Sequence, residues 1–185
     1  MAAAPKSFTA EMVRHLNDLH DWGWPRYEVV DGELLVTPAP RKLHQLVVNE
    51  LHLALGNYLK REPIGRAFAS PADLSWGHRK LVQPDVFVVP LDEVRKPEWT
   101  AVRHLLLAVE VLSPSNARGD RIVKRKLYQH EGVPAYWMVD ADAKVVEIWT
   151  PEAKAARVER GTLLWHPAGA STPFTLALAE LFQPI

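Results

Sequence analysis

Two acidic residues lie in stretches where a soluble protein rarely places a charge. Glu110 lies within "LLLAVEVL" (105–112), an almost wholly aliphatic run that is typical of a strand buried on both faces. Asp85 lies in "QPDVFVV", at the start of a second apolar run. Burying a carboxylate is costly unless the group is paired, hydrogen-bonded or bound to a metal ion. Both residues are therefore candidates for a functional site.

The two candidates would form a metal site if their strands are neighbours. Side chains alternate along a strand, so Asp85 shares a face with Phe87, and Glu110 shares one with Ala108 and Leu112. Two adjacent carboxylates repel each other unless a cation lies between them. Mg²⁺ suits that position, because it takes oxygen ligands and needs only one or two carboxylates. Alternatively, each acid is an ordinary carboxylate that accepts backbone hydrogen bonds or pairs with a lysine.

A segment with a local excess of positive charge follows the Glu110 run. The stretch "RGDRIVKRK" (118–126) holds five basic residues and one acid. It belongs to a predicted amphipathic helix in which Asp120, Lys124 and Tyr128 are four residues apart and share one face. Because this helix follows the Glu110 strand through the short turn "SPSN", Lys124 could lie over the carboxylates. Alternatively, Asp120 and Lys124 form an ordinary surface ion pair.

Other basic side chains of the same helix project in other directions. They could contact phosphate groups, which positions a nucleic-acid strand without reading its sequence. The candidates are Arg121, Arg125 and Lys126. The whole chain, in contrast, carries 22 basic and 22 acidic residues. Its zero net charge argues against a protein that coats nucleic acid by overall attraction.

Helical and strand-like patterns surround these residues. Apolar spacing and chain-breaking residues predict helices over 10–19 with Thr9 as its cap, 41–61, 116–131 with Gly132 as its cap, and 176–182. Strands are predicted on both sides of Asp31-Gly32, near 66–70, 72–76, 81–89, 105–112 and 162–166, and as a hairpin over 134–150. This is an α/β (α+β) pattern, a mixed β-sheet flanked by helices, with an N-terminal helix and β-hairpin. We expect one domain over 1–185, with 1–8 as a flexible tail.

The overall composition excludes several classes of protein. The chain has 185 residues, of which 48% are hydrophobic and 24% charged, as in an ordinary soluble domain. It contains no cysteine, which excludes disulfides and thiolate metal sites. No apolar run approaches the roughly 18–20 residues that cross a bilayer, and the N-terminus does not resemble a signal peptide. We therefore expect a cytoplasmic protein without membrane contact. The seven tryptophans are expected to pack in the core or at subunit interfaces.

These motifs together resemble the Uma-two family of candidate endonucleases. The resemblance rests on "YEVVDGELLVTP", "QPDVFVV", "LAVEVLSPS", the spacing of Asp120, Lys124 and Tyr128, and "GVPAYWMVD". It covers about residues 26–150. It implies a restriction-endonuclease-like core of the PD-(D/E)xK superfamily, with Mg²⁺ or Mn²⁺ held by Asp85 and Glu110.

One position departs from the superfamily pattern. The usual E-x-K motif would place a lysine at position 112, where this chain has Leu112. The resemblance implies that Lys124 supplies this ammonium from the next helix. It also gives Glu33 and His44 as further site residues that could act as outer ligands or position a water molecule. Glu33 could equally be a surface residue of the hairpin. Gln83 and Ser113 are possible hydrogen-bond donors behind the site.

The function implied by the resemblance is metal-dependent endonucleolytic hydrolysis of DNA phosphodiester bonds. Asp85, Glu110, Lys124, Glu33 and His44 would be the catalytic residues. One alternative is a catalytically inactive nuclease fold that acts as a nucleic-acid-binding or scaffold homodimer. Another is a hydrolase with a closed pocket for a small phosphoester. A homodimer is also expected for the active enzyme, since a duplex has two strands to cut and symmetric pairs are common.

Overall fold

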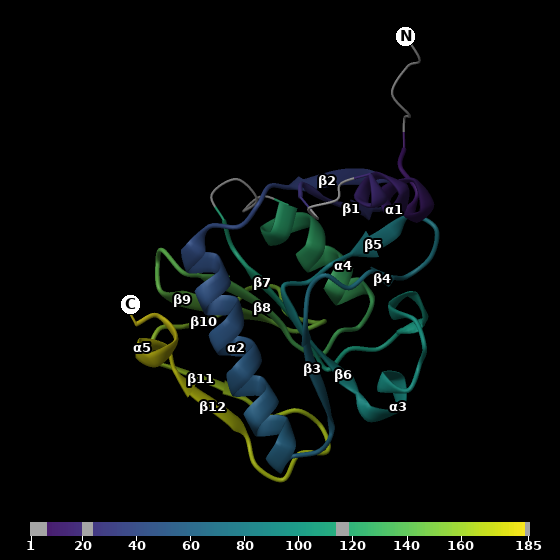
Figure 1. The fold of residues 1–185 in the computed structure, drawn as a ribbon. Helices are drawn as coiled ribbons and strands as arrows, with labels where there is room; N and C mark the ends of the chain where they lie inside the picture. Colours follow the sequence, from purple (N-terminus) through teal and green to yellow (C-terminus); the bar gives the residue numbers. More distant parts are fainter. Residues whose placement is uncertain (1–6, 20–23, 114–118, 184–185) are drawn as a thin grey trace.

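A six-stranded mixed β-sheet forms the centre of the protein in a computed structural model (Figure 1). The structure describes residues 7–19, 24–113 and 119–183, apart from the side chains of 119–121. Strands of the central sheet lie in the order β10-β9-β8-β7-β6-β3. Their bounds are β3 (Gly65–Ala69), β6 (Val86–Pro90), β7 (Leu107–Val111), β8 (Tyr136–Asp140), β9 (Val145–Trp149) and β10 (Arg157–Glu159).

Strands β7 and β8 pair in parallel, while the other described neighbours in this sheet pair antiparallel. A parallel pair requires a crossover connection. Here the crossover contains the π-helical turn η2 (Gly119–Lys124) and helix α4 (Arg125–His130). Gly132, with a φ of 69°, follows the end of the helix as predicted. The crossover therefore carries Lys124 and Tyr128 back across the sheet beside β7.

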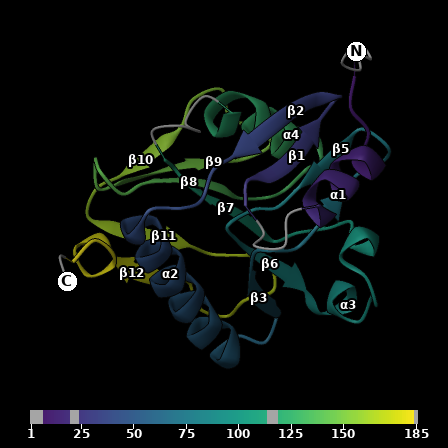
Figure 2. The same ribbon diagram turned by 45° about the horizontal axis from the view of Figure 1, so that its top comes forward.

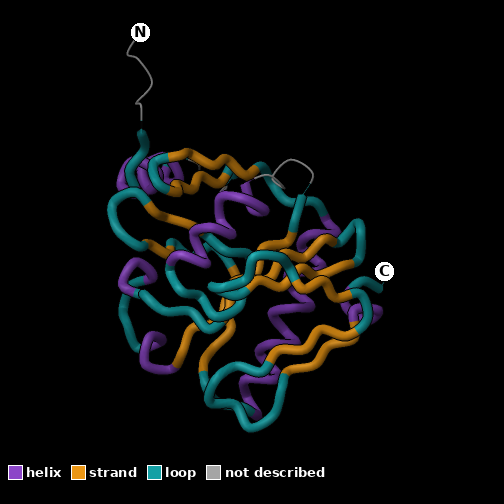
Figure 3. Tube along the Cα trace, turned by 180° about the vertical axis from the view of Figure 1, so that it is seen from behind, coloured by secondary structure: helices purple, strands orange, loops and turns teal. Residues whose placement is uncertain are grey.

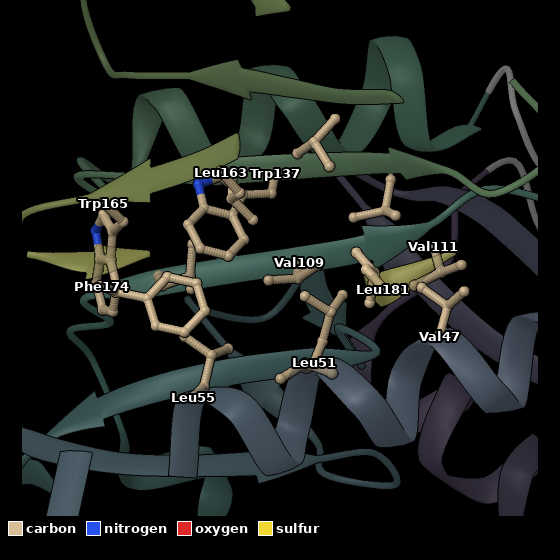
Figure 4. Close-up of a cluster of buried hydrophobic side chains, with 14 of the residues drawn as sticks. Val47, Leu51, Leu55, Val109, Val111, Trp137, Leu163, Trp165, Phe174 and Leu181 are labelled. Atoms are coloured by element: carbon tan, nitrogen blue, oxygen red, sulfur yellow. The ribbon is translucent and has the colours of Figure 1, made fainter. Parts of the chain in front are cut away.

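One face of the central sheet is covered by helix α2 (Lys42–Arg61), with helix α5 (Leu178–Leu181) and the pair β11 (Thr162–Trp165) and β12 (Phe174–Ala177) beside it (Figure 1). Leu51 and Leu55 lie four residues apart on α2 and are fully buried. Both point from the helix toward Val109 and Trp137 of the sheet (Figure 4). This apolar layer fixes the position of α2, and so of the residues in its first turn.

The opposite face is covered by α4 and by a second sheet. Seen from behind, α4 lies in front of the central strands and α2 lies behind them (Figure 3). The second sheet has the order β2-β1-β5-β4 and lies with helix α1 over the ends of β6 and β7 (Figure 2). Its bounds, with those of the remaining helices, are α1 (Ala10–Asp18), β1 (Arg26–Val30), β2 (Glu33–Thr37), β4 (Leu74–Ser75), β5 (Lys80–Val82), α3 (Leu91–Val94) and η1 (Trp99–Ala101).

Most predicted elements are present in the described residues. Thr9 caps α1, since its hydroxyl oxygen accepts the backbone N–H of Met12 at 3.2 Å. Asp31 and Gly32 have φ values of 50° and 89°, and they form the predicted turn between β1 and β2. Helix α2 and the β8–β9 hairpin also match the predicted segments. None of the described helices combines the length and the apolar character needed to span a membrane.

The predicted strand over 81–89 is wrong, because it forms two strands in different sheets. Strand β5 ends at Val82, and β6 begins at Val86. Pro84 has no N–H for a ladder, so the chain leaves the first sheet there and enters the second. Asp85 consequently lies between the two sheets. The short elements β10, β12, α3 and η1 were not predicted, and β12 occupies the start of the predicted helix 176–182.

Candidate active site

Asp85 and Glu110 lie on neighbouring chain segments, which is the condition that a shared site requires. Strands β6 and β7 pair antiparallel with Val86 opposite Val109, which places Asp85 opposite Glu110 one step further on. The backbone N–H of Val111 donates to Asp85 Oδ2 at 2.9 Å and ties the two segments together. Asp85 is 5% exposed and Glu110 is 1% exposed. The core of the site is therefore a pair of buried carboxylates at the junction of the two sheets.

Asp85 is held by two side chains from different parts of the fold. Arg26 on β1 donates from Nη2 to Oδ1 at 3.1 Å, and His44 in the first turn of α2 places Nε2 3.1 Å from Oδ2. Burial alone would raise the pKa of Asp85. The hydrogen bond with His44 and the charge of Arg26 outweigh burial and hold the pKa of this carboxyl well below its usual range. Asp85 is therefore ionised.

Glu110 is paired with the displaced lysine that the sequence suggested. Lys124 Nζ lies 2.9 Å from Glu110 Oε1 and 2.8 Å from Glu28 Oε2, and the lysine is only 1% exposed. Tyr128, one turn further along the helix, donates its hydroxyl to Glu110 Oε1 at 3.0 Å. Burial and the adjacent charge of Glu110 raise the pKa of Tyr128 well above its ordinary value. The neutral phenol thus remains a hydrogen-bond donor to the carboxylate.

Strand β1 contributes two residues that the sequence interpretation missed. Arg26 and Glu28 are two positions apart, so both point toward the central sheet. Glu28 is fully buried, and its Oε1 accepts the backbone N–H of Gln83 at 2.7 Å. The Gln83 side chain donates from Nε2 to Asp73 Oδ1 at 2.6 Å. The sequence signal for these two residues was the presence of charges in the otherwise apolar stretch "RYEVV". The same signal identified Asp85 and Glu110.

The other predicted site residues lie apart from this cluster or outside the described side chains. Glu33 is exposed at the start of β2, opposite Val30, which lies roughly 13 Å along β1 from Arg26. The guanidinium of Arg125 lies 4.4 Å from the centre of the Trp149 ring. Lys126 is exposed, and the side chain of Arg121 lies outside the described part of the structure.

Protein cations take part of the role that the sequence interpretation assigned to a metal. Arg26 and Lys124 contact Asp85, Glu110 and Glu28, so fixed side chains already reduce the repulsion between the carboxylates. Among the residues that the structure describes, no group of three acidic or histidine side chains forms a complete metal site. The chemistry of the donors still suits Mg²⁺, because Asp85 and Glu110 supply the one or two carboxylates that this ion requires.

The Asp85 end of the cluster reaches two surface hollows. Asp85, Arg26 and His44 line a hollow of about 220 Å³. Arg26 and His44 also line a second hollow of about 200 Å³, together with Ser113. A ligand in the first hollow would meet the carboxylate and the two groups that hold it, and a ligand in the second would meet Arg26 and His44.

Comparisons with known proteins identify the family. A family model described as "Putative restriction endonuclease" (Uma2) matches residues 15–179. The chain belongs to the Uma2 family. Its fold is similar to that of a crystal structure described as "a putative nuclease belonging to DUF820" from Anabaena variabilis, with a TM-score of 0.71 and 23% identity over 85% of this chain and 90% of that chain. No curated protein matches the chain.

Membership of the Uma2 family confirms the predicted resemblance, and the structural match confirms the fold class. Family and fold together indicate a restriction-endonuclease-like nuclease, a class that acts on nucleic acid. The matched segment contains all the residues of the buried cluster, from Arg26 on β1 to Tyr128 on α4.

Proposed function

We propose that this Uma2 protein is a metal-dependent endonuclease that hydrolyses phosphodiester bonds of DNA. One observation supports this most strongly. Asp85 and Glu110 are opposed across β6 and β7, and the Lys124 ammonium lies 2.9 Å from Glu110. Two carboxylates and a cation in one buried cluster suit a reaction in which negative charge builds up on a phosphate group.

Each member of the cluster has a role in the proposed reaction. Asp85 and Glu110 would hold Mg²⁺ or Mn²⁺, which when bound lowers the pKa of a water ligand and polarises the phosphate. Lys124 would orient the attacking water or neutralise a phosphate oxygen. His44 and Arg26 orient Asp85 and keep it ionised. Tyr128 orients Glu110 from the side of the helix.

Residues outside the cluster would position the substrate. Lys126 is exposed on α4 and suited to contact a phosphate group. We assign Arg121 and Arg125 to the same task. A homodimer of this chain would present two such sites to the two strands of a duplex.

A second candidate is a nuclease fold that binds nucleic acid as a homodimer without cutting it. It is favoured by the ion pairs of Asp85 and Glu110 with Arg26 and Lys124, which neutralise the carboxylates without a metal ion. The two candidates differ in what a divalent ion does. An endonuclease requires it for turnover, whereas a binding protein does not.

Cleavage assays separate these candidates. Purified protein is incubated with double-stranded DNA, single-stranded DNA and RNA in the presence of Mg²⁺, Mn²⁺ or EDTA. We expect cleavage of DNA with either ion and none in EDTA. Asp85→Ala should reduce the rate by at least about 10²-fold, as expected when a group that stabilises the transition state is lost. Binding of DNA without cleavage under every condition would support the second candidate.

A further inference from the structure

We propose that Glu28 is a positioning residue that holds the Lys124 ammonium in place while a divalent ion occupies Glu110. This inference rests on the proposed nuclease function, and it gives a role to a buried acid that the proposed reaction does not otherwise use. Glu28 lies on β1 in the second sheet and is fully buried. It therefore cannot touch the substrate, and its effect must pass through the residues that it contacts.

The need for a second partner of Lys124 follows from the position of Glu110. Lys124 Nζ donates to Glu110 Oε1 at 2.9 Å. The proposed divalent ion would share this carboxylate, and two cations on one carboxylate repel each other. An ammonium held by Glu110 alone would then be driven away from the place where its charge is required. A carboxylate that is not a metal ligand removes this conflict.

Glu28 supplies such a carboxylate. Its Oε2 lies 2.8 Å from Lys124 Nζ, yet this buried oxygen has no hydrogen-bond partner among the described residues. A buried acceptor without a hydrogen bond is costly, and an ammonium has three N–H donors to offer. A small shift of the Lys124 side chain would complete this hydrogen bond when the ion takes Glu110. Glu28 is thus a second acceptor for the ammonium, already in contact with it.

Glu28 is also fastened to the segment that carries Asp85. Its Oε1 accepts the backbone N–H of Gln83 at 2.7 Å, two residues before Asp85. One oxygen of the carboxylate is therefore bound to the Asp85 segment, and the other lies beside Lys124. This arrangement fixes the ammonium relative to Asp85, independently of the state of Glu110.

The same contacts argue against Glu28 as a third metal ligand. Both of its oxygens face groups of the protein, one a backbone N–H and the other the Lys124 ammonium. Among the described residues, Arg26 lines both hollows at the Asp85 end of the cluster, whereas Glu28 lines neither. The two charged residues of β1 thus have different tasks. Arg26 holds Asp85, and Glu28 holds Lys124.

Protection of Lys124 from a reagent tests this role without cleavage. Full-length protein in EDTA is treated with acetic anhydride, and acetylation of Lys124 is measured by mass spectrometry. Glu110→Gln removes the charge that the ion would occupy, and Lys124 should stay protected because Glu28 still holds it. When Glu28→Gln is added, Lys124 should be acetylated at least about tenfold faster, as expected for the loss of a hydrogen bond between charged groups.

The control double variant loses a buried glutamate that pairs with a different lysine. Glu93→Gln combined with Glu110→Gln removes a partner of Lys96 and should leave Lys124 as protected as Glu110→Gln alone does. Equal acetylation of Lys124 in the two double variants would overturn the inference.

Mn²⁺ provides a test that needs only the wild type and one single variant. Glu28→Gln keeps an amide oxygen for the Gln83 N–H and leaves Glu110 to pair with Lys124, so it should fold. Binding of the ion is followed by the electron paramagnetic resonance signal of free Mn²⁺. As Mn²⁺ binds, Lys124 should stay protected in wild type and become acetylated in Glu28→Gln.

Two results of this experiment would overturn the inference. One is acetylation of Lys124 in wild type on Mn²⁺ binding, because Glu28 would then fail to hold it. The other is a loss of Mn²⁺ affinity in Glu28→Gln as large as the loss in Asp85→Asn, because Glu28 would then be a metal ligand.

Turnover separates this inference from the proposed function. Glu28→Gln should lower kcat about tenfold and leave KM unchanged. In the Lys124→Met background it should cause no further loss, because Glu28 acts only through the lysine. Additive losses would overturn the inference and leave the nuclease function intact. If wild type neither binds Mn²⁺ nor cleaves DNA, the proposed function fails, while the acetylation rates in EDTA still decide whether Glu28 holds Lys124.

Discussion

Two glutamates of this protein, Glu110 and Glu93, are both buried and both contact basic side chains, yet their surroundings differ. Glu93 in α3 is 4% exposed, and its partners are Lys96 Nζ at 2.7 Å and His104 Nδ1 at 2.9 Å. The side chains of these partners are 34% and 76% exposed. The partner of Glu110, Lys124, is buried as deeply as the glutamate itself. The cations that pair with Glu93 are therefore in contact with solvent, whereas the cation that pairs with Glu110 is not.

The comparison shows which buried acids indicate a functional site. Glu93 also accepts the backbone N–H of Arg103 at 2.7 Å, so it fastens α3 to the segment that leads into β7. This is a structural role. Its desolvation cost is small, because the partners of Glu93 remain partly hydrated. A fully buried ion pair recovers its desolvation cost poorly, and an apolar replacement is often as stable. The cluster of Glu110, Lys124 and Glu28 is therefore better explained by chemistry than by stability.

The largest expected difference in stability is between variants of Lys124 and Lys96, the lysines that pair with Glu110 and Glu93. Lys124→Met leaves Glu28 and Glu110 buried without their shared cation, so the free energy of unfolding should fall by about 3–5 kcal/mol. Lys96→Met removes a partly exposed partner of Glu93 and should cost less than about 1 kcal/mol. Urea unfolding in EDTA measures both values. Equal losses for the two variants would remove the distinction between the two glutamates.

Binding of a divalent ion should also distinguish the surroundings of Glu110 from those of Glu93. If Asp85 and Glu110 bind Mg²⁺, the ion stabilises the native state by mass action. It should therefore raise the melting temperature of wild type and restore part of the stability lost in Lys124→Met. Lys96→Met should show only the same increase as wild type, since Glu93 lies outside the site. Melting curves with and without millimolar Mg²⁺ measure these shifts, and the absence of any shift in wild type would contradict the metal assignment.

Much of the site could be predicted because two short periodicities determine it. Alternation along β6 and β7 places Asp85 and Glu110 side by side, and helical spacing places Lys124 and Tyr128 on one face of the crossover helix. The helical spacing needs only the sequence near each residue, whereas the contact of Asp85 with Glu110 also requires that β6 and β7 pair, which the sequence offered only as a condition. The family motif added His44, whose contact with Asp85 depends on the packing of α2 against the sheet.

Other parts of the site could not be predicted because they depend on contacts between distant segments. Strand β1 could have exposed either face, and only its packing over the central sheet buries Arg26 and Glu28. Pro84 marks a break, but the sequence does not say that the chain changes sheets there. Glu33 matches the family motif, but the sequence pattern did not show that its side chain is exposed beside the turn between β1 and β2.

A smaller effect is expected for two buried tyrosines that donate to different acceptors. The Tyr128 hydroxyl donates to the charged Glu110 at 3.0 Å, and the Tyr58 hydroxyl donates to the neutral carbonyl of Thr172 at 2.7 Å. Tyr128→Phe should lower the free energy of unfolding by about 1.5–3 kcal/mol, and Tyr58→Phe by about 0.5–1.5 kcal/mol. Chemical denaturation of both variants tests the order, and a larger loss at Tyr58 would contradict a charged Glu110.

The smallest effect concerns Glu93 and depends on pH. Burial would raise the pKa of Glu93, but hydrogen bonds from Lys96 and the backbone of Arg103, together with the contact to His104, lower it to about 2 from an ordinary value of 4.5. A lowered pKa means that the folded state favours the charged form. The stabilisation by Glu93 is therefore complete above about pH 4.5 and is lost as the pH falls toward 2.

The variant Glu93→Gln isolates this contribution. Wild type should be more resistant to urea than Glu93→Gln at about pH 5. The gap between the two midpoints should narrow at about pH 3, because the unfolded wild-type chain then takes up a proton on Glu93 that the folded protein still excludes. Other carboxylates change equally in both proteins and cancel in the difference. A gap that stays constant between these pH values would mean that Glu93 gains nothing from its charge, and its burial would then reflect packing alone.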